Sequence, residues 1–246
     1  MLARVETRPY PFDGKLLAAI GVSFALGILL WSSWPLYPFK LLVVLMHESG
    51  HAAATLLAGG SVQRIQVDPR EGGYTLGLVP LGLVRQIVIS SAGYVGSTIS
   101  GCILLWVAAR ARQGRWPLVA LAAWTGTVAL VWVRDAFTLA FAAGSTLALA
   151  LVARFAPPVV RRGVLVFLGT FSVSYALYDI RDDLLRLGSR SGGLSDADAL
   201  ARATYIPAIV WGIGWGLLSL LLVALTLRRV LSAGPAFTPT ARPSTT

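Results

Sequence analysis

Residues 41–58 read LLVVLMHESGHAAATLLA and hold both histidines of the 246-residue chain. The run is long enough for a helix inside a membrane, and polar side chains interrupt it mainly at His47, Glu48 and His51. Residues four apart lie on one face of an α-helix, so both imidazoles can bind one metal ion. Glu48 lies about 100° around the helix from His47, beside the metal position. This geometry is typical of zinc hydrolases, in which two histidines bind the ion and the glutamate works on the attacking water.

The composition of the chain excludes a soluble domain. Hydrophobic residues make up 56% of the sequence and charged residues only 13%, which is typical of a polytopic membrane protein. The formal net charge of +10 would favour nucleic-acid binding in a soluble chain. Here the arginines cluster at the ends of apolar runs, where they anchor helices against lipid headgroups. We therefore expect the lipid bilayer as a partner and no nucleic acid.

Seven apolar runs are long enough to span a bilayer, which predicts an all-α polytopic membrane protein with about seven transmembrane helices. Only Arg134 and Asp135 separate the fourth run from the fifth, so these two form a tight hairpin or one of them is partly buried in protein. Residues 1–233 should form a single membrane domain, and residues 234–246, rich in Pro, Thr and Ser, a disordered tail. The runs are residues 16–34, 39–58, 87–109, 116–133, 136–154, 163–180 and 207–227.

A short β-hairpin-like loop is expected directly after the HExxH helix. Residues 61–80 alternate weakly in polarity and turn at residues 68–73, which read DPREGG. An ordinary connecting loop is the alternative. As a hairpin, the segment would offer a free strand edge, and a peptide substrate could pair with that edge in an extended form.

Small residues every four positions predict close helix packing in the third run. Gly93, Ser97 and Gly101 share one face, against which another helix can approach closely. The HExxH helix is a candidate partner, because it carries Gly50, Ala54 and Ala58 at the same spacing.

Two histidines leave zinc one short of the three protein ligands that a catalytic site usually has. The chain has no third histidine, and Cys102 is its single cysteine. A better source is the acidic cluster Asp179, Asp182 and Asp183, whose members share one helical face. With the second and sixth runs crossing in the same direction, Asp179 and His51 differ in depth by only about 6 Å. We therefore predict a metal site of His47, His51 and Asp179. Asp182 or Asp183 could take the place of Asp179, and the alternative is that the whole acidic cluster is only a solvated helix end.

The ordered set of motifs resembles the site-2 protease superfamily of intramembrane zinc metalloproteases, in particular its short branch without a PDZ domain. This resemblance implies a metalloendopeptidase with zinc as cofactor, Glu48 as catalytic base, a membrane-protein substrate and a place in a bacterial cell membrane. It also implies an aspartate within the membrane as third ligand. The motifs are residues 46–52, 58–60, 71–73, 92–97, 178–183 and 195–197.

The chain also departs from the pattern of that superfamily. It contains no asparagine, so the Asn-Pro signature is absent, and the Leu-Asp-Gly signature is absent as well. Arg134 could replace the missing asparagine as a donor to the oxyanion, or it could pair with Asp135. Two other classes of function remain open: a metal or proton transporter that uses the same polar residues, and a catalytically silent membrane scaffold.

Overall fold

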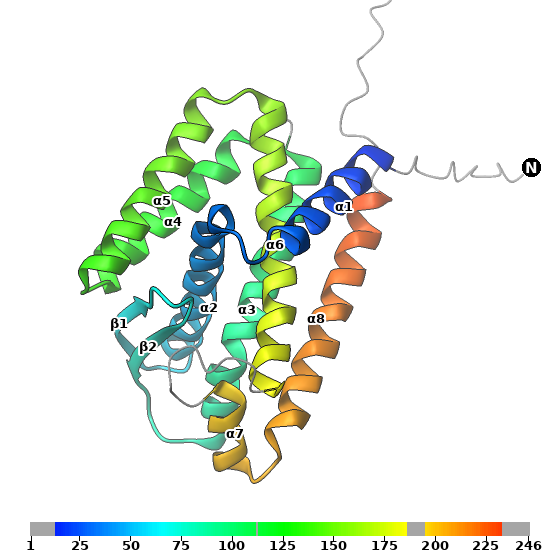
Figure 1. Ribbon diagram of the computed structural model, residues 1–246. Helices are drawn as coiled ribbons and strands as arrows, with labels where there is room; N and C mark the ends of the chain where they lie inside the picture. The colour runs from blue at the N-terminus through cyan, green and yellow to red at the C-terminus, as the bar shows by residue number, and fades with distance from the viewer. Residues whose placement is uncertain (1–12, 112, 186–194, 233–246) are drawn as a thin grey trace, which may run out of the picture.

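The computed structural model describes residues 13–111, 113–185 and 195–232, which form helices apart from one two-stranded hairpin (Figure 1). Each of the seven apolar runs overlaps a helix of 16 residues or more. The elements are α1 (Gly14–Leu29), a 3₁₀ turn η1 (Trp34–Leu36), α2 (Tyr37–Leu57), β1 (Ser61–Val67), β2 (Gly73–Leu78), α3 (Leu83–Arg110), α4 (Arg115–Trp132), α5 (Ala136–Phe155), α6 (Pro158–Leu185), α7 (Asp196–Thr204) and α8 (Ala208–Leu231).

Among the described residues, four helices are long and apolar enough to cross a membrane: α3, α5, residues 158–181 of α6, and α8. The predicted number of about seven spans is therefore not confirmed. Helix α1 has only 16 residues. Lys40 and the polar site residues lower the hydropathy of α2, and Arg115 opens the 18 residues of α4.

Helices α2, α3 and α6 lie side by side at the centre of the molecule (Figure 1). The α4–α5 pair leans against one side of this group, and α1 and α8 cover the other side. Gly101 of α3 and Gly169 of α6 face each other, since a Cβ on either would lie within 2.9 Å of the other's carbonyl oxygen. Gly50 of α2 meets the backbone of Ala92 in the same way. The small-residue face of α3 thus packs against two helices, of which only α2 was expected.

The hairpin predicted after the HExxH helix is confirmed. Strands β1 and β2 pair antiparallel from Ser61 opposite Leu78 to Val67 opposite Gly73, and both pack on α2. Glu71 in the turn has a φ of 69°, in the left-handed region. A partly buried ion pair of 3.1 Å joins its carboxylate to the buried Lys40 of α2 and so ties the turn to the start of that helix.

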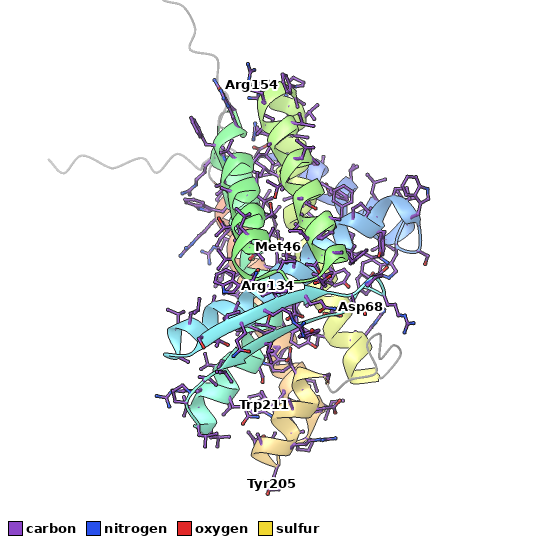
Figure 2. The ribbon with its side chains drawn as sticks, turned by 90° about the vertical axis from the view of Figure 1, so that its left-hand side faces the viewer. Met46, Asp68, Arg134, Arg154, Tyr205 and Trp211 are labelled. Atoms are coloured by element: carbon purple, nitrogen blue, oxygen red, sulfur yellow. The ribbon has the colours of Figure 1, made fainter. Side chains whose placement is uncertain are left out.

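Helix α7 was not predicted. Ser195 caps it, because its hydroxyl accepts a hydrogen bond from the amide of Asp198 at 3.1 Å. Ala197 and Leu200 then bury against α3, α6 and α8 in one cluster with Tyr94, Ile180 and Trp215. Figure 1 shows α7 between the ends of α3 and α8, and Figure 2 labels Tyr205 and Trp211 beside it. This docking places the first residue of α7, Asp196, against α2.

The loop between α4 and α5 shows no pairing of Arg134 with Asp135. The guanidinium of Arg134 instead donates to the carbonyl oxygens of Val131 and Val133 at the end of α4, beside the hairpin (Figure 2). Asp135 caps α5, since its Oδ1 accepts a hydrogen bond from the amide of Thr138 at 2.8 Å. The predicted tail, residues 234–246, lies outside the described residues, as do the side chains of Asp182 and Asp183.

Candidate metal centre

The helical spacing of His47 and His51 brings their two rings together as the sequence predicts. Their Nε2 atoms lie 3.0 Å apart, and the ring planes are inclined by 72°. The Nδ1 atom of His51 lies 2.7 Å from the carbonyl oxygen of Ile89 in α3. An Nδ1–H that donates to this carbonyl leaves Nε2 with a free lone pair, the arrangement common in metal-binding histidines.

A carboxylate that the sequence analysis did not select completes the cluster. Oδ2 of Asp196 lies 3.3 Å from Nε2 of His47 and 3.1 Å from Nε2 of His51. Burial by itself would raise the pKa of Asp196, but the two adjacent imidazoles hold that pKa below its usual range. The side chain is therefore an ionised carboxylate at neutral pH, which could serve as an oxygen ligand.

The three donor atoms fit a single zinc ion. Zinc binds histidine nitrogen and carboxylate oxygen at about 2.0–2.2 Å, which separates two ligands of a tetrahedron by roughly 3.3–3.6 Å. The observed separations of 3.0, 3.1 and 3.3 Å lie at the lower end of that range or a few tenths of an ångström below it. Gly93 of α3 keeps the space beside the donors open, since a Cβ there would lie 2.5 Å from Nε2 of His51 and closer still to Nε2 of His47.

Asp179, the predicted third ligand, lies on the other side of the His47 ring. Its Oδ2 is 4.0 Å from Nδ1 of His47, whereas Asp196 faces Nε2. Of the described residues that could hold a metal ion, the structure groups His47, His51 and Asp196 within 4.8 Å of one another. The geometry thus favours Asp196 over Asp179. The depth comparison matched helices α2 and α6 and took no account of α7, which approaches α2 from outside both of them.

The carboxylate of Glu48 lies in the contact between α2 and β2, on the same helix as the two histidines. Only 4% of this residue is exposed, and its Oε2 accepts a hydrogen bond of 2.9 Å from the hydroxyl of Thr75. The ring of Tyr94 stands edge-on to His47, 4.7 Å between centroids, and stacks on Trp215. The ring of His47 is therefore held both by packing against Tyr94 and by the contact with Asp196 of the short helix.

A local signal for Asp196 is present in the sequence. Residues 195–198 read SDAD, a serine followed by acidic residues, which is typical of a helix start. Such a signal predicts helix α7 but does not place it. The position of Asp196 depends on the burial of Leu200 against Tyr94 and Trp215, which are far away in sequence.

His47 and His51 of α2 and Asp196 of α7 surround a shared point, and the buried Glu48 lies between the two histidines in sequence. This arrangement is the one expected of membrane-bound metallopeptidases with an HExxH motif. The chain belongs to the Peptidase M50B-like family, which matches residues 19–226. This match confirms the resemblance to the site-2 protease superfamily. No curated protein and no solved structure matched the chain. With its four long apolar helices, the family membership identifies an integral membrane protein.

Proposed function

We propose that this protein is a zinc-dependent intramembrane endopeptidase that hydrolyses a peptide bond of a membrane protein within or near the bilayer. The observation that carries the proposal is the convergence of His47, His51 and Asp196 on one point, next to the buried carboxylate of Glu48. Family membership supports a metallopeptidase. The location in a bacterial cell membrane rests on the resemblance alone.

His47, His51 and Asp196 would hold the zinc ion, and Asp179 would support the Nδ1 side of His47 as an outer partner. When bound, zinc polarises the scissile carbonyl and makes water more acidic. This assignment differs from the sequence prediction, in which Asp179 itself is the ligand. Asp196 has the better position because it reaches both histidines at their Nε2 atoms.

Glu48 acts as the general base in this proposal. Its carboxylate accepts a proton from the attacking water and later donates that proton to the leaving amine nitrogen. Hydrolysis then leaves a carboxylic acid on one fragment and an amine on the other. The low exposure of Glu48 keeps bulk water from competing for its proton.

The outer edge of β2 offers the place where a substrate strand would bind. The sheet contains β1 and β2 only, so among the described residues the second edge of β2 pairs with no strand. A peptide added there would be held extended by backbone hydrogen bonds, as proteolysis requires. A helical substrate must unwind before it can bind in this way.

We also propose that α1, α2 and α4 cross the bilayer together with the four long apolar helices, which gives seven spans. Helix α2 is enclosed by α3, α6 and the hairpin, so its polar residues face protein in place of lipid. The metal centre would then lie below the membrane surface, where a membrane-protein substrate can reach it.

A comparison of membranes that contain the parental protein with membranes that contain Glu48→Gln tests this function. We expect at least one membrane protein whose fragment disappears in the variant, with cleavage slower by at least about 10²-fold, because a general base is lost. The variant should keep its zinc, since Glu48 is not a ligand. Equal cleavage by both proteins would contradict the proposal. Zinc transport into vesicles by both proteins, without cleavage, would instead favour the transporter alternative.

A further inference from the structure

Strand β2 turns three small residues toward helix α2. Side chains of a strand alternate between its faces, so Gly73, Thr75 and Gly77 share one face. A Cβ at position 73 would lie 2.8 Å from Oε1 of Glu48, and one at position 77 would lie 2.9 Å from the side chain of Thr55. The two glycines therefore allow the strand to lie directly on α2. Thr75, between them, is the residue of this face with a polar side chain.

The hydroxyl of Thr75 contacts Glu48 at two atoms. Its Oγ1 lies 2.8 Å from the main-chain carbonyl oxygen of Glu48 and 2.9 Å from Oε2 of the carboxylate. The hydroxyl has one proton, which the carbonyl oxygen and the carboxylate oxygen of Glu48 share as acceptors. Oε2 is thereby held beside Thr75, while Oε1 lies against Gly73.

The hairpin that carries Thr75 is itself anchored at its turn. Tyr37 donates its hydroxyl proton to the carbonyl oxygen of Pro69 at 2.7 Å, and Lys40 pairs with Glu71 at 3.1 Å. The amide of Val67 donates to Oγ1 of Thr138 in α5 at 2.9 Å. Because hydrogen bonds and an ion pair to α2 and α5 hold the end of the hairpin, Thr75 lies on an anchored strand and has a fixed position.

We propose that Thr75 is a positioning residue for the general base: its hydroxyl aims the carboxylate of Glu48, and the hairpin thereby takes part in catalysis as well as in substrate pairing. The inference rests on the proposed function, in which Glu48 is the base. Loss of the hydroxyl frees the carboxylate to rotate. A misplacement of about 1 Å in such a group can reduce the rate by about 10²-fold.

Two substitutions separate the hydroxyl from the shape of the side chain. Thr75→Val keeps the branched shape and removes the hydroxyl, whereas Thr75→Ser keeps the hydroxyl. For Thr75→Val we expect kcat to fall about 10- to 100-fold, with KM within about twofold of the parental value and zinc content unchanged. Thr75→Ser should restore kcat to within about threefold. Thr125→Val removes a buried hydroxyl whose hydrogen bonds lie within the α4–α5 pair, and it should leave kcat unchanged.

A parental kcat for Thr75→Val would overturn the inference, and so would an equal loss of kcat in Thr75→Ser and Thr75→Val. A double-mutant cycle of thermal unfolding midpoints, with Thr75→Val and Glu48→Ala, tests the contact without any need for cleavage. We expect the combined shift to be smaller than the sum of the single shifts. Additive shifts would overturn the inference. If the parental protein cleaves nothing but the midpoint shifts are non-additive, the proposed function is contradicted while the contact between Thr75 and Glu48 is supported.

Discussion

Gly93→Ala should remove the metal from the centre while leaving the fold in place. Gly93 of α3 faces the two Nε2 atoms, and a Cβ at this position would lie 2.5 Å from that of His51. Ordinary contact between such atoms needs 3.4 Å or more. At least one imidazole must therefore move by about 1 Å, several times the tolerance of about 0.2 Å in a zinc–ligand distance. We expect zinc affinity to fall by at least about 10²-fold, more than the loss of an outer partner causes.

The assay is a zinc titration of purified protein against a competing chelator, with the thermal unfolding midpoint recorded for each variant. Gly144→Ala in α5 is the matched control, because no atom lies within 4 Å of the added Cβ. Gly50→Ala provides a contrast, since its Cβ would clash with the backbone of Ala92 and should lower stability directly. A folded Gly93→Ala protein with parental zinc affinity would refute the placement of the metal at the Nε2 atoms that Gly93 faces.

Three further results follow from the packing around the centre. Leu200→Ala should weaken zinc binding more than it lowers overall stability, because Leu200 is fully buried and docks the short helix that carries Asp196. A zinc titration measures the effect, with Leu225→Ala, at an exposed position, as the control. Glu71→Gln should lower the free energy of unfolding by about 3 kcal/mol, because it leaves Lys40 buried without its ion pair, and adding Lys40→Met should recover part of this loss in denaturant unfolding. Removal of zinc by a chelator should lower the thermal unfolding midpoint, since a free zinc concentration of 1,000 times Kd adds about 4.1 kcal/mol to the free energy of unfolding. An unchanged midpoint would count against a bound metal.

The parts of the site that lie close together in sequence could be predicted. Helical spacing alone places His47 beside His51, and the turn residues at 68–73 predict the hairpin that packs on α2. Long apolar runs predict the helices, but hydropathy does not decide which of them span, because the site residues themselves make α2 more polar.

The parts that depend on distant contacts could not be predicted. Asp196 reaches the histidines because Leu200 buries against Tyr94 and Trp215. No periodic pattern in the sequence predicts this tertiary contact. Gly93 was expected to serve helix packing only. In the structure its missing side chain also leaves room at the Nε2 atoms, a role that becomes visible only when α2 and α3 are placed together.

Zinc content by elemental analysis of the parental protein, Asp196→Ala and Asp179→Ala tests the central claim most directly. We expect about one zinc per chain in the parental protein, loss of most of it in Asp196→Ala, and retention with weakened affinity in Asp179→Ala. Loss of zinc in Asp179→Ala together with retention in Asp196→Ala would contradict the assignment. A well-folded parental protein that carries no zinc after purification in its presence would contradict the metal centre itself.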